Sequence, residues 1–409
     1  MVRPTVALIA ALLSASLPLH AQRNKGKKHD WRLDTYTLRD PKAMRRLGYK
    51  SFGPFPWGDD HSTELIEQRL GSTVRLRWVE TRHFRIGSSL PAWKPTSGRG
   101  KKRKAVAKQL RSELVELAKT LPHLKPKRIK VWDPWLRLHV YAMRLERQRA
   151  EFLRRLGPQR VRSATANQPG NKWDHRGLPP KFAVLLLGTT AQLEAYLAQF
   201  LQLRQKFGTR HVFRKNNTPL FVTTAANQLW DDTALHAHVV FNVTHLFVRS
   251  YNGNFYRLPV WIGEGLAHYF ARQVDDRWSN YSQAPASESE MRYRDDWPIV
   301  TTLLAKSDNF RAFPKLIRLF EFSDLRFRDH IALWSRVAWL MNDEEHEFGL
   351  GTFLNGIKGL RTAKGLTLDS EPALLRAQEK ALQAAWGRSS DEVDPAWKKC
   401  VLAKRKRKR

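Results

Sequence analysis

Apolar stretches of two kinds predict a small mixed sheet in the first part of the chain. Residues 73–86 alternate apolar with mostly basic side chains, which is the two-residue period of a half-buried strand or hairpin. The continuous apolar run 182–187 is typical of a strand buried on both faces. Residues 211–214 and 220–224, joined by a polar turn, indicate a second hairpin.

Apolar residues at helical spacing predict helices between and after these strands. We expect them at about 105–120, 134–156, 191–207 and 232–249, with a short one from about 261. Beyond 290 the pattern is helical throughout, most clearly at 326–342 and 370–386. The prediction is therefore an α/β (α+β) fold, in which a small mixed sheet with helices is followed by an all-helical C-terminal part that closes one wall of a cleft.

The N-terminus has the pattern of a secretory signal peptide, residues 1–21. Arg3 precedes an apolar run from Val6 to Leu17, and Ala21 is a small residue before Gln22. The run is too short to span a bilayer as a stable helix, and no later stretch is long and apolar enough. We expect a protein that is exported to the periplasm, the envelope or the exterior and has no transmembrane helix after signal removal. The alternative is a buried N-terminal helix.

Composition divides the remaining chain into four parts. Residues 22–72 are basic, aromatic and weakly periodic, and we interpret them as an extended N-terminal arm. Residues 73–290 form the α/β part and 291–403 the helical part, while 404–409 are a tail of basic residues only. Hydrophobic residues make up 42% of the chain, enough for a sizeable core rather than disorder.

The formal net charge of +34 favours anionic partners. The basic runs 99–104 and 404–409 could bind anionic envelope polymers or nucleic acid, although charge runs are usually solvated loops and tails. Cys400 is the only cysteine, which excludes a disulfide within the chain and a zinc site built from cysteines.

The chemistry concentrates between residues 235 and 270, which read LHAHVVFNVTHLFVRSYNGNFYRLPVWIGEGLAHYF. Eighteen residues separate His245 from Glu264, and Glu264 lies within the motif Trp261-Ile-Gly-Glu-Gly-Leu-Ala-His-Tyr269. This spacing and motif resemble those of the gluzincin (peptidase MA-like) zinc metallopeptidases. Those enzymes bind zinc with an H-E-x-x-H helix and with a glutamate, often in W-x-x-E-G-x-A-x-Y, on a following helix.

The resemblance implies a zincin-like fold over roughly residues 73–400, with His245 as the second zinc histidine and Glu264 as the third ligand. The order of flanking elements is similar to that of uncharacterised exported families of the same group. It includes a strand ending at His83-Phe84, the 182–187 strand, and a helical tail containing 333–340 and 394–397.

The chain departs from the family where catalysis requires specific groups. Phe241 stands where the first zinc histidine belongs, and Asn242, which cannot take a proton from water, stands where the general base belongs. No Asp or Glu lies between Thr233 and Gly263 to substitute. Related peptidases often place an acid four residues after the glutamate ligand to orient a zinc histidine, and this chain has His268 there.

Three functional hypotheses follow. The first is a catalytically inactive homologue without a cofactor, which retains a cleft for a peptide or protein and in which His245 and Glu264 form a buried pair. The second is an active zinc peptidase with a rearranged ligand set of His245, Glu264 and His268; losing the positioned base would still cost roughly 10²–10⁴-fold in rate. The third is a polyanion-binding envelope protein on a zincin scaffold.

Three other motifs carry less chemistry. His236 and His238 precede His245 on the same expected helix, and two turns, roughly 10 Å of rise, separate His238 from His245. The sequence from His346 starts like H-E-x-x-H but has Leu at its last position. Asn242-Val-Thr is a glycosylation triplet in the middle of an expected helix, where modification is not expected.

Overall fold

The computed structural model describes residues 30–95, 101–158, 176–253, 258–277, 280, 296–358 and 371–406. The expected signal peptide, 1–21, lies outside these residues, as do 97–100 and 407–409 of the basic runs. Within the described ranges, no helix combines the length and apolar character needed to cross a membrane.

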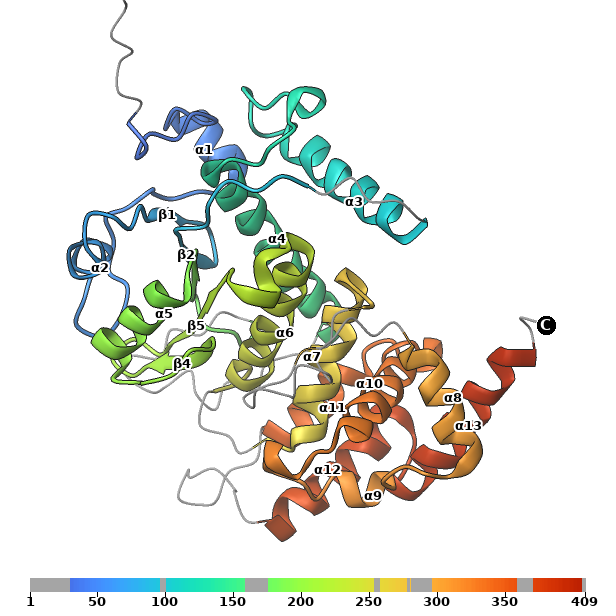
Figure 1. Ribbon diagram of the computed structural model, residues 1–409. Coiled ribbons are helices and arrows are strands. Elements are labelled where there is room, and N and C mark those ends of the chain that lie inside the picture. The colour runs from blue at the N-terminus through green and yellow to red at the C-terminus, as the bar shows by residue number, and fades with distance from the viewer. Residues whose placement is uncertain are drawn as a thin grey trace, which may run out of the picture.

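Five strands form one mixed sheet (Figure 1). Their spatial order is β1 (Arg77–Glu80), β2 (Phe84–Ser88), β3 (Phe182–Leu187), β5 (Thr218–Thr224) and β4 (Thr209–Phe213). β2, β3 and β5 run parallel, whereas the outer strands β1 and β4 each pair antiparallel with their neighbour. The expected mixed sheet and both hairpins are therefore confirmed.

Helices cover both faces of the sheet, which explains why every side chain of β3 is buried. Phe182, Val184 and Leu186 belong to the larger core, which includes side chains of α4 (Pro134–Leu156) and α6 (Asp232–Ser250). The alternate residues of β3 point to a second core with α2 (Thr63–Leu70) and α5 (Thr190–Tyr196). A strand packed on both faces needs apolar residues at every position, as the sequence indicated.

The described residues from 296 to 406 form helices joined by short turns and contain no strand, as predicted. It packs beside α7 (Val260–Val274), with α10 in direct contact with α7 (Figure 1). Its helices are α8 (Trp297–Ser307), α9 (Phe313–Leu316), α10 (Phe327–Met341), α11 (Gly349–Lys358), α12 (Glu371–Trp386) and α13 (Ser390–Lys406).

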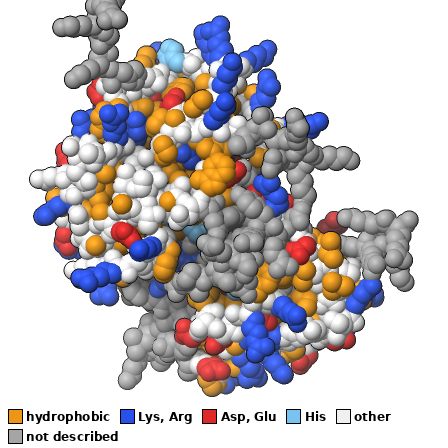
Figure 2. All heavy atoms as spheres, viewed as in Figure 1, with side chains coloured by type: hydrophobic (Ala, Val, Ile, Leu, Met, Phe, Trp, Pro, Cys, Tyr) orange, Lys and Arg blue, Asp and Glu red, His pale blue; other side chains and the backbone are white. Residues whose placement is uncertain are grey.

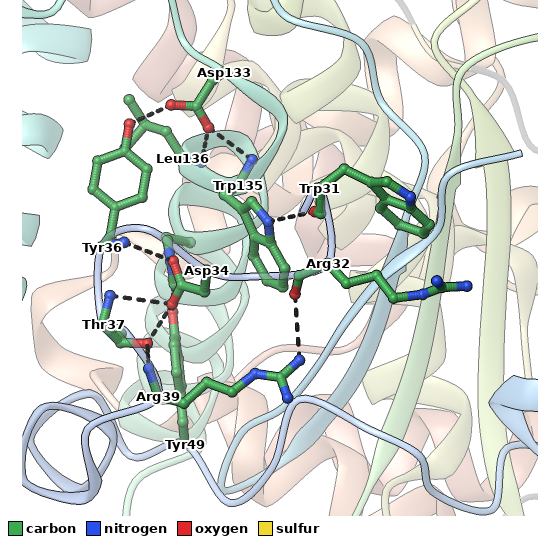
Figure 3. Close-up of polar contacts among 11 residues, drawn as sticks. Trp31, Arg32, Asp34, Tyr36, Thr37, Arg39, Tyr49, Asp133, Trp135 and Leu136 are labelled. Atoms are coloured by element: carbon green, nitrogen blue, oxygen red, sulfur yellow. Dashed lines mark hydrogen bonds and ion pairs between the residues drawn. The ribbon is translucent and has the colours of Figure 1, made fainter. Parts of the chain in front are cut away.

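The segment 30–72 differs from the extended arm that we expected. It contains α1 (Pro41–Leu47) and α2, and its first turns pack against the start of α4 (Figure 3). The Tyr36 hydroxyl donates a hydrogen bond to Asp133, and the Asp34 carboxylate lies 3.0 Å from Nε2 of His139. Weak periodicity misled the prediction because this segment gains its order from aromatic and polar contacts with α4.

Several boundaries also differ from the sequence expectation. α3 (Lys101–Leu117) begins inside the basic run 99–104, a few residues before the expected start at about 105. The helix expected at 191–207 is shorter: after α5 a π-helical turn, η2 (Leu197–Leu201), ends at Gln202, whose φ of 57° is left-handed. Short 3₁₀ turns occur at η1 (Pro126–Arg128), η3 (Asn227–Trp230), η4 (Phe322–Asp324) and η5 (Glu344–His346).

Candidate functional site

α6 and α7 bring His245 and Glu264 into contact. Asp231 caps the N-terminus of α6 by accepting hydrogen bonds from the next turn, and the helix continues without a break past His245. α7 begins directly after Pro259 and presents Glu264 to α6. His245 Nε2 lies 3.0 Å from Oε1 of Glu264, whose side chain is completely buried. The structure thus places the two motif residues side by side.

Two further histidines meet the other oxygen of the same carboxylate. His268 lies one helical turn after Glu264, and its Nε2 is 3.5 Å from Oε2 of Glu264. His330, from α10, has its Nδ1 3.2 Å from the same Oε2 and 3.1 Å from His268 Nε2. Donor atoms of Glu264, His268 and His330 all lie within 4.8 Å of one another, a grouping that could hold a metal ion.

Sequence reasoning missed His330. It lies in the helix that was expected at 326–342, but no motif connects it with the 235–270 stretch. One signal was available: His330 shares a face with Leu333 and Val337, at helical spacing, so a histidine stands on an otherwise apolar stripe. A buried histidine in that position needs a polar partner, and here the partner is Glu264.

Phe241 stands where the resemblance to gluzincin peptidases implies a zinc histidine. Its ring is fully buried and contacts both neighbouring imidazoles, with ring centroids 5.0 Å from His245 and 4.9 Å from His268. The side-chain amide of Asn242 donates to the carbonyl oxygen of His238, 3.0 Å away on its own helix. The residues at 241, 242 and 245 therefore do not fit the zinc site of a gluzincin peptidase.

Burial controls protonation in this cluster. Burial lowers the pKa of His245 to about 4, and the positive charge of Arg210 adds to the effect, so the ring is neutral at pH 7. Burial also lowers the pKa of His268 well below its ordinary value. Burial alone would raise the pKa of the Glu264 carboxyl, but the neighbouring imidazoles of His245 and His330 outweigh it and hold that pKa well below its usual range.

The short contacts of Glu264 lack the angles of good hydrogen bonds. Both carboxylate oxygens of Glu264 and Nε2 of His245 are buried without a hydrogen-bond partner among the described residues, despite the distances given above. A buried polar group without a hydrogen-bond partner costs about 1–3 kcal/mol of stability, and an ionised group costs more. Hydrogen bonds among the described residues therefore leave the Glu264 carboxylate unsatisfied.

A pocket of about 340 Å³ opens beside His245. Its walls come from β4, α6, α7 and the turn at 320–322, and they include Gly263. The lining residues include two arginines, Arg210 on β4 and Arg249 on α6, and one acidic residue, Glu321. Burial lowers the pKa of Arg210 to about 10, although the Glu264 charge opposes this, so the guanidinium stays charged at pH 7.

No protein-family model, curated protein or solved structure matched this chain. The site is therefore interpreted from its own geometry.

The remaining sequence candidates lie elsewhere. His236 faces the ring of Tyr141, and His238 Nδ1 is 2.9 Å from the side-chain oxygen of Asn280. His346 contacts Asp343 at 3.2 Å in the 3₁₀ turn η5, away from Glu264. Asn242, the residue of the glycosylation triplet that would carry the sugar, is buried in α6 and its side-chain amide donates to the helix backbone, which leaves no room for a sugar in the folded protein.

The basic runs are only partly described. Residues 101–104 begin α3 and 404–406 end α13. Figure 2 shows Lys and Arg side chains at many places around one face, most densely along its upper edge. Exposed basic residues include Lys125, Lys127, Arg128 and Lys130 around η1. Binding of anionic polymers stays a prediction of the charge alone.

Proposed function

We propose that this chain is a catalytically inactive relative of the gluzincin peptidases that binds an extended peptide in the pocket beside His245. The observation that carries the proposal is the packing of the Phe241 ring against His245 and His268. An aromatic ring there can neither ligate zinc nor activate water, while the pocket next to it stays open. Export, expected from residues 1–21, belongs to the same proposal.

The edge of the sheet supports a peptide as the ligand. β4 is an outer strand, hydrogen-bonded to β5 on one side only, and Arg210, His211 and Val212 of β4 line the pocket. An outer strand presents backbone N–H and C=O groups that a partner strand can pair with. A peptide in an extended conformation would use these groups for affinity and the pocket for a side chain or terminus.

The charges of the pocket favour a carboxylate on that peptide. Arg210 and Arg249 together outweigh Glu321 among the lining residues. Guanidinium groups bind carboxylates with paired hydrogen bonds, which are about twice as strong as neutral ones. We therefore expect a preference for an acidic side chain or a free C-terminus over a basic or amidated one.

Gly263 provides a matched test of the pocket. A Cβ added there would lie 3.4 Å from His245 Nδ1, which the neighbouring ring can accommodate with at most a small adjustment. Gly263→Ala should therefore fold and keep the pocket, since alanine favours a helix by about 1 kcal/mol over glycine. Gly263→Phe should fill the pocket instead.

The measurement is peptide affinity by fluorescence anisotropy, with peptides selected on a display library and re-made with free and amidated C-termini. The proposal expects Gly263→Phe to weaken binding at least tenfold and Gly263→Ala to leave it within about twofold. Equal affinity for both variants, or cleavage of the bound peptide, would contradict it.

A second candidate is an active hydrolase with rearranged ligands, and the convergence of Glu264 with His268 favours it. His245, the other residue of the expected set, reaches Glu264 through the opposite oxygen, and His330 takes its place beside His268. Peptidase turnover that disappears in Glu264→Ala would establish this candidate. Polyanion binding, the third candidate, would show as affinity that falls steeply with added salt.

A further inference from the structure

We propose that Glu264, His268 and His330 bind a divalent transition-metal ion of the zinc class between α7 and α10. This site shares only the glutamate with the ligand set that the gluzincin resemblance implies, and the ring of Phe241 packs against its His268. The inference goes beyond the peptide-binding proposal and does not depend on it, because no pocket residue is a ligand.

The three donor atoms have the spacing of a metal's coordination shell. Ligand atoms about 2.0–2.1 Å from a tetrahedral zinc ion lie about 3.3–3.4 Å apart. The edges of this triangle are 3.5 Å from Glu264 Oε2 to His268 Nε2, 3.2 Å from Oε2 to His330 Nδ1, and 3.1 Å between the two nitrogens. All three edges are close to the required value, so a small cation fits without moving the backbone.

Hydrogen bonds cannot satisfy all three of these atoms at once. An ionised carboxylate oxygen brings no proton, and each imidazole nitrogen brings at most one. If both nitrogens are protonated, two N–H groups face each other across 3.1 Å; if only one is, a lone pair of the other nitrogen faces the carboxylate. A cation at the centre accepts all three lone pairs at once. Oε2 of Glu264 is buried and has no hydrogen-bond partner among the described residues, which leaves it available to a cation.

The donor types select the kind of ion. Two imidazole nitrogens with one carboxylate oxygen suit Zn²⁺ and neighbouring transition metals better than Ca²⁺ or Mg²⁺, which prefer oxygen ligands. His268 and Glu264, four residues apart, present their donors from one face of α7, while His330 comes from α10.

The surroundings indicate that this ion would hold the helices together rather than meet a substrate. Glu264, His268 and His330 are 0%, 1% and 6% exposed. The rings of Phe241 and Trp297 lie on His268, with centroids 4.9 and 5.0 Å away. His245 contacts the remaining oxygen of Glu264 and fixes the orientation of the carboxylate.

The test uses the full-length mature protein. Its metal content is measured after purification without chelators, and the chelator-treated protein is then titrated with Co²⁺, followed by its visible absorption, and with Zn²⁺, followed by the unfolding temperature. We expect about one equivalent of metal per chain, a Co²⁺ spectrum of nitrogen and oxygen ligands in low coordination number, and a higher unfolding temperature with Zn²⁺.

Two substitutions locate the ion. His330→Gln should weaken Co²⁺ binding at least tenfold, whereas the matched control His123→Gln, at an exposed histidine after α3, should leave it unchanged. Wild-type protein that binds neither ion, or equal binding by His330→Gln and wild type, would overturn the proposal. If His330→Gln does not fold, the wild-type titration decides alone, and peptide binding by the metal-free protein is scored separately.

Discussion

His245 Nε2 lies 3.0 Å from Oε1 of Glu264, and this buried contact joins α6 to α7. In a gluzincin peptidase the corresponding groups would face a common zinc ion. Here Phe241 fills the space on one side of the pair, so the histidine meets the carboxylate directly. Under our proposal, the contact between the two helices is therefore structural and not catalytic.

Removing the imidazole of this pair should destabilise the fold. His245→Leu leaves the buried Glu264 charge with one contact fewer, and we expect a loss of about 2–3 kcal/mol in the free energy of unfolding. His245→Gln keeps an N–H group on that side and should lose less. Urea unfolding at pH 7 measures both variants. Equal losses would mean that His245 contributes through its packing and not through Glu264.

Gly265 should be required by the close approach of α7 to α10. A Cβ at position 265 would lie 2.4 Å from Cγ2 of Val337, which is a clash. Gly265→Ala should therefore cost about 1–3 kcal/mol of stability, although alanine favours helices. In Gly265→Ala/Val337→Ala the space is restored, and the double variant should be more stable than the sum of the single losses predicts. Strict additivity in urea unfolding would contradict the close contact.

A buried ion-pair network at the start of α6 should make stability sensitive to acid. Burial would raise the pKa of Asp232, but Arg144 and Arg137, at 2.7 and 2.9 Å, outweigh it and lower that pKa to about 2. Its ordinary value in an unfolded chain is about 3.9. A carboxyl with a lowered pKa stabilises the fold above the unfolded value, and the contribution disappears as the pH falls from about 4 to about 2.

Asp232→Asn therefore gives two linked results. At pH 7 it should lose about 3–5 kcal/mol, because two buried guanidinium groups lose a counter-charge. Between about pH 4 and pH 2 its stability should fall less steeply than that of wild type, because one titrating group is absent. Urea unfolding over this pH range measures both. Parallel pH profiles of variant and wild type would show that Asp232 is not the group that titrates.

Periodicity predicted most elements of the sheet and the helical part because burial there is local to each element. The all-apolar run of β3 lies between two cores, and the bounds of α4 follow its apolar stripe and its terminal Gly157. The segment 30–72 could not be predicted in this way. Its order depends on partners such as Asp133 and His139, which are about a hundred residues away in the sequence.

The candidate site was predictable only where it is contiguous in sequence. His245 and Glu264 lie in one stretch with a recognisable spacing, so their contact could be expected. His330 comes from α10, and only the packing of α10 on α7 shows that it faces Glu264. The role of Phe241 is similar: the sequence identified a missing ligand, whereas its contact with two imidazoles needed the structure.

The most direct test of peptide binding without catalysis is the fate of a bound peptide. A selected peptide is incubated with the mature protein, with and without added Zn²⁺, and recovered for mass spectrometry. We predict that it binds the pocket and is recovered intact under both conditions, because Phe241 and Asn242 supply neither a ligand nor a base. Cleavage of the peptide by wild-type protein, abolished in Glu264→Ala, would contradict the proposal and show an active peptidase.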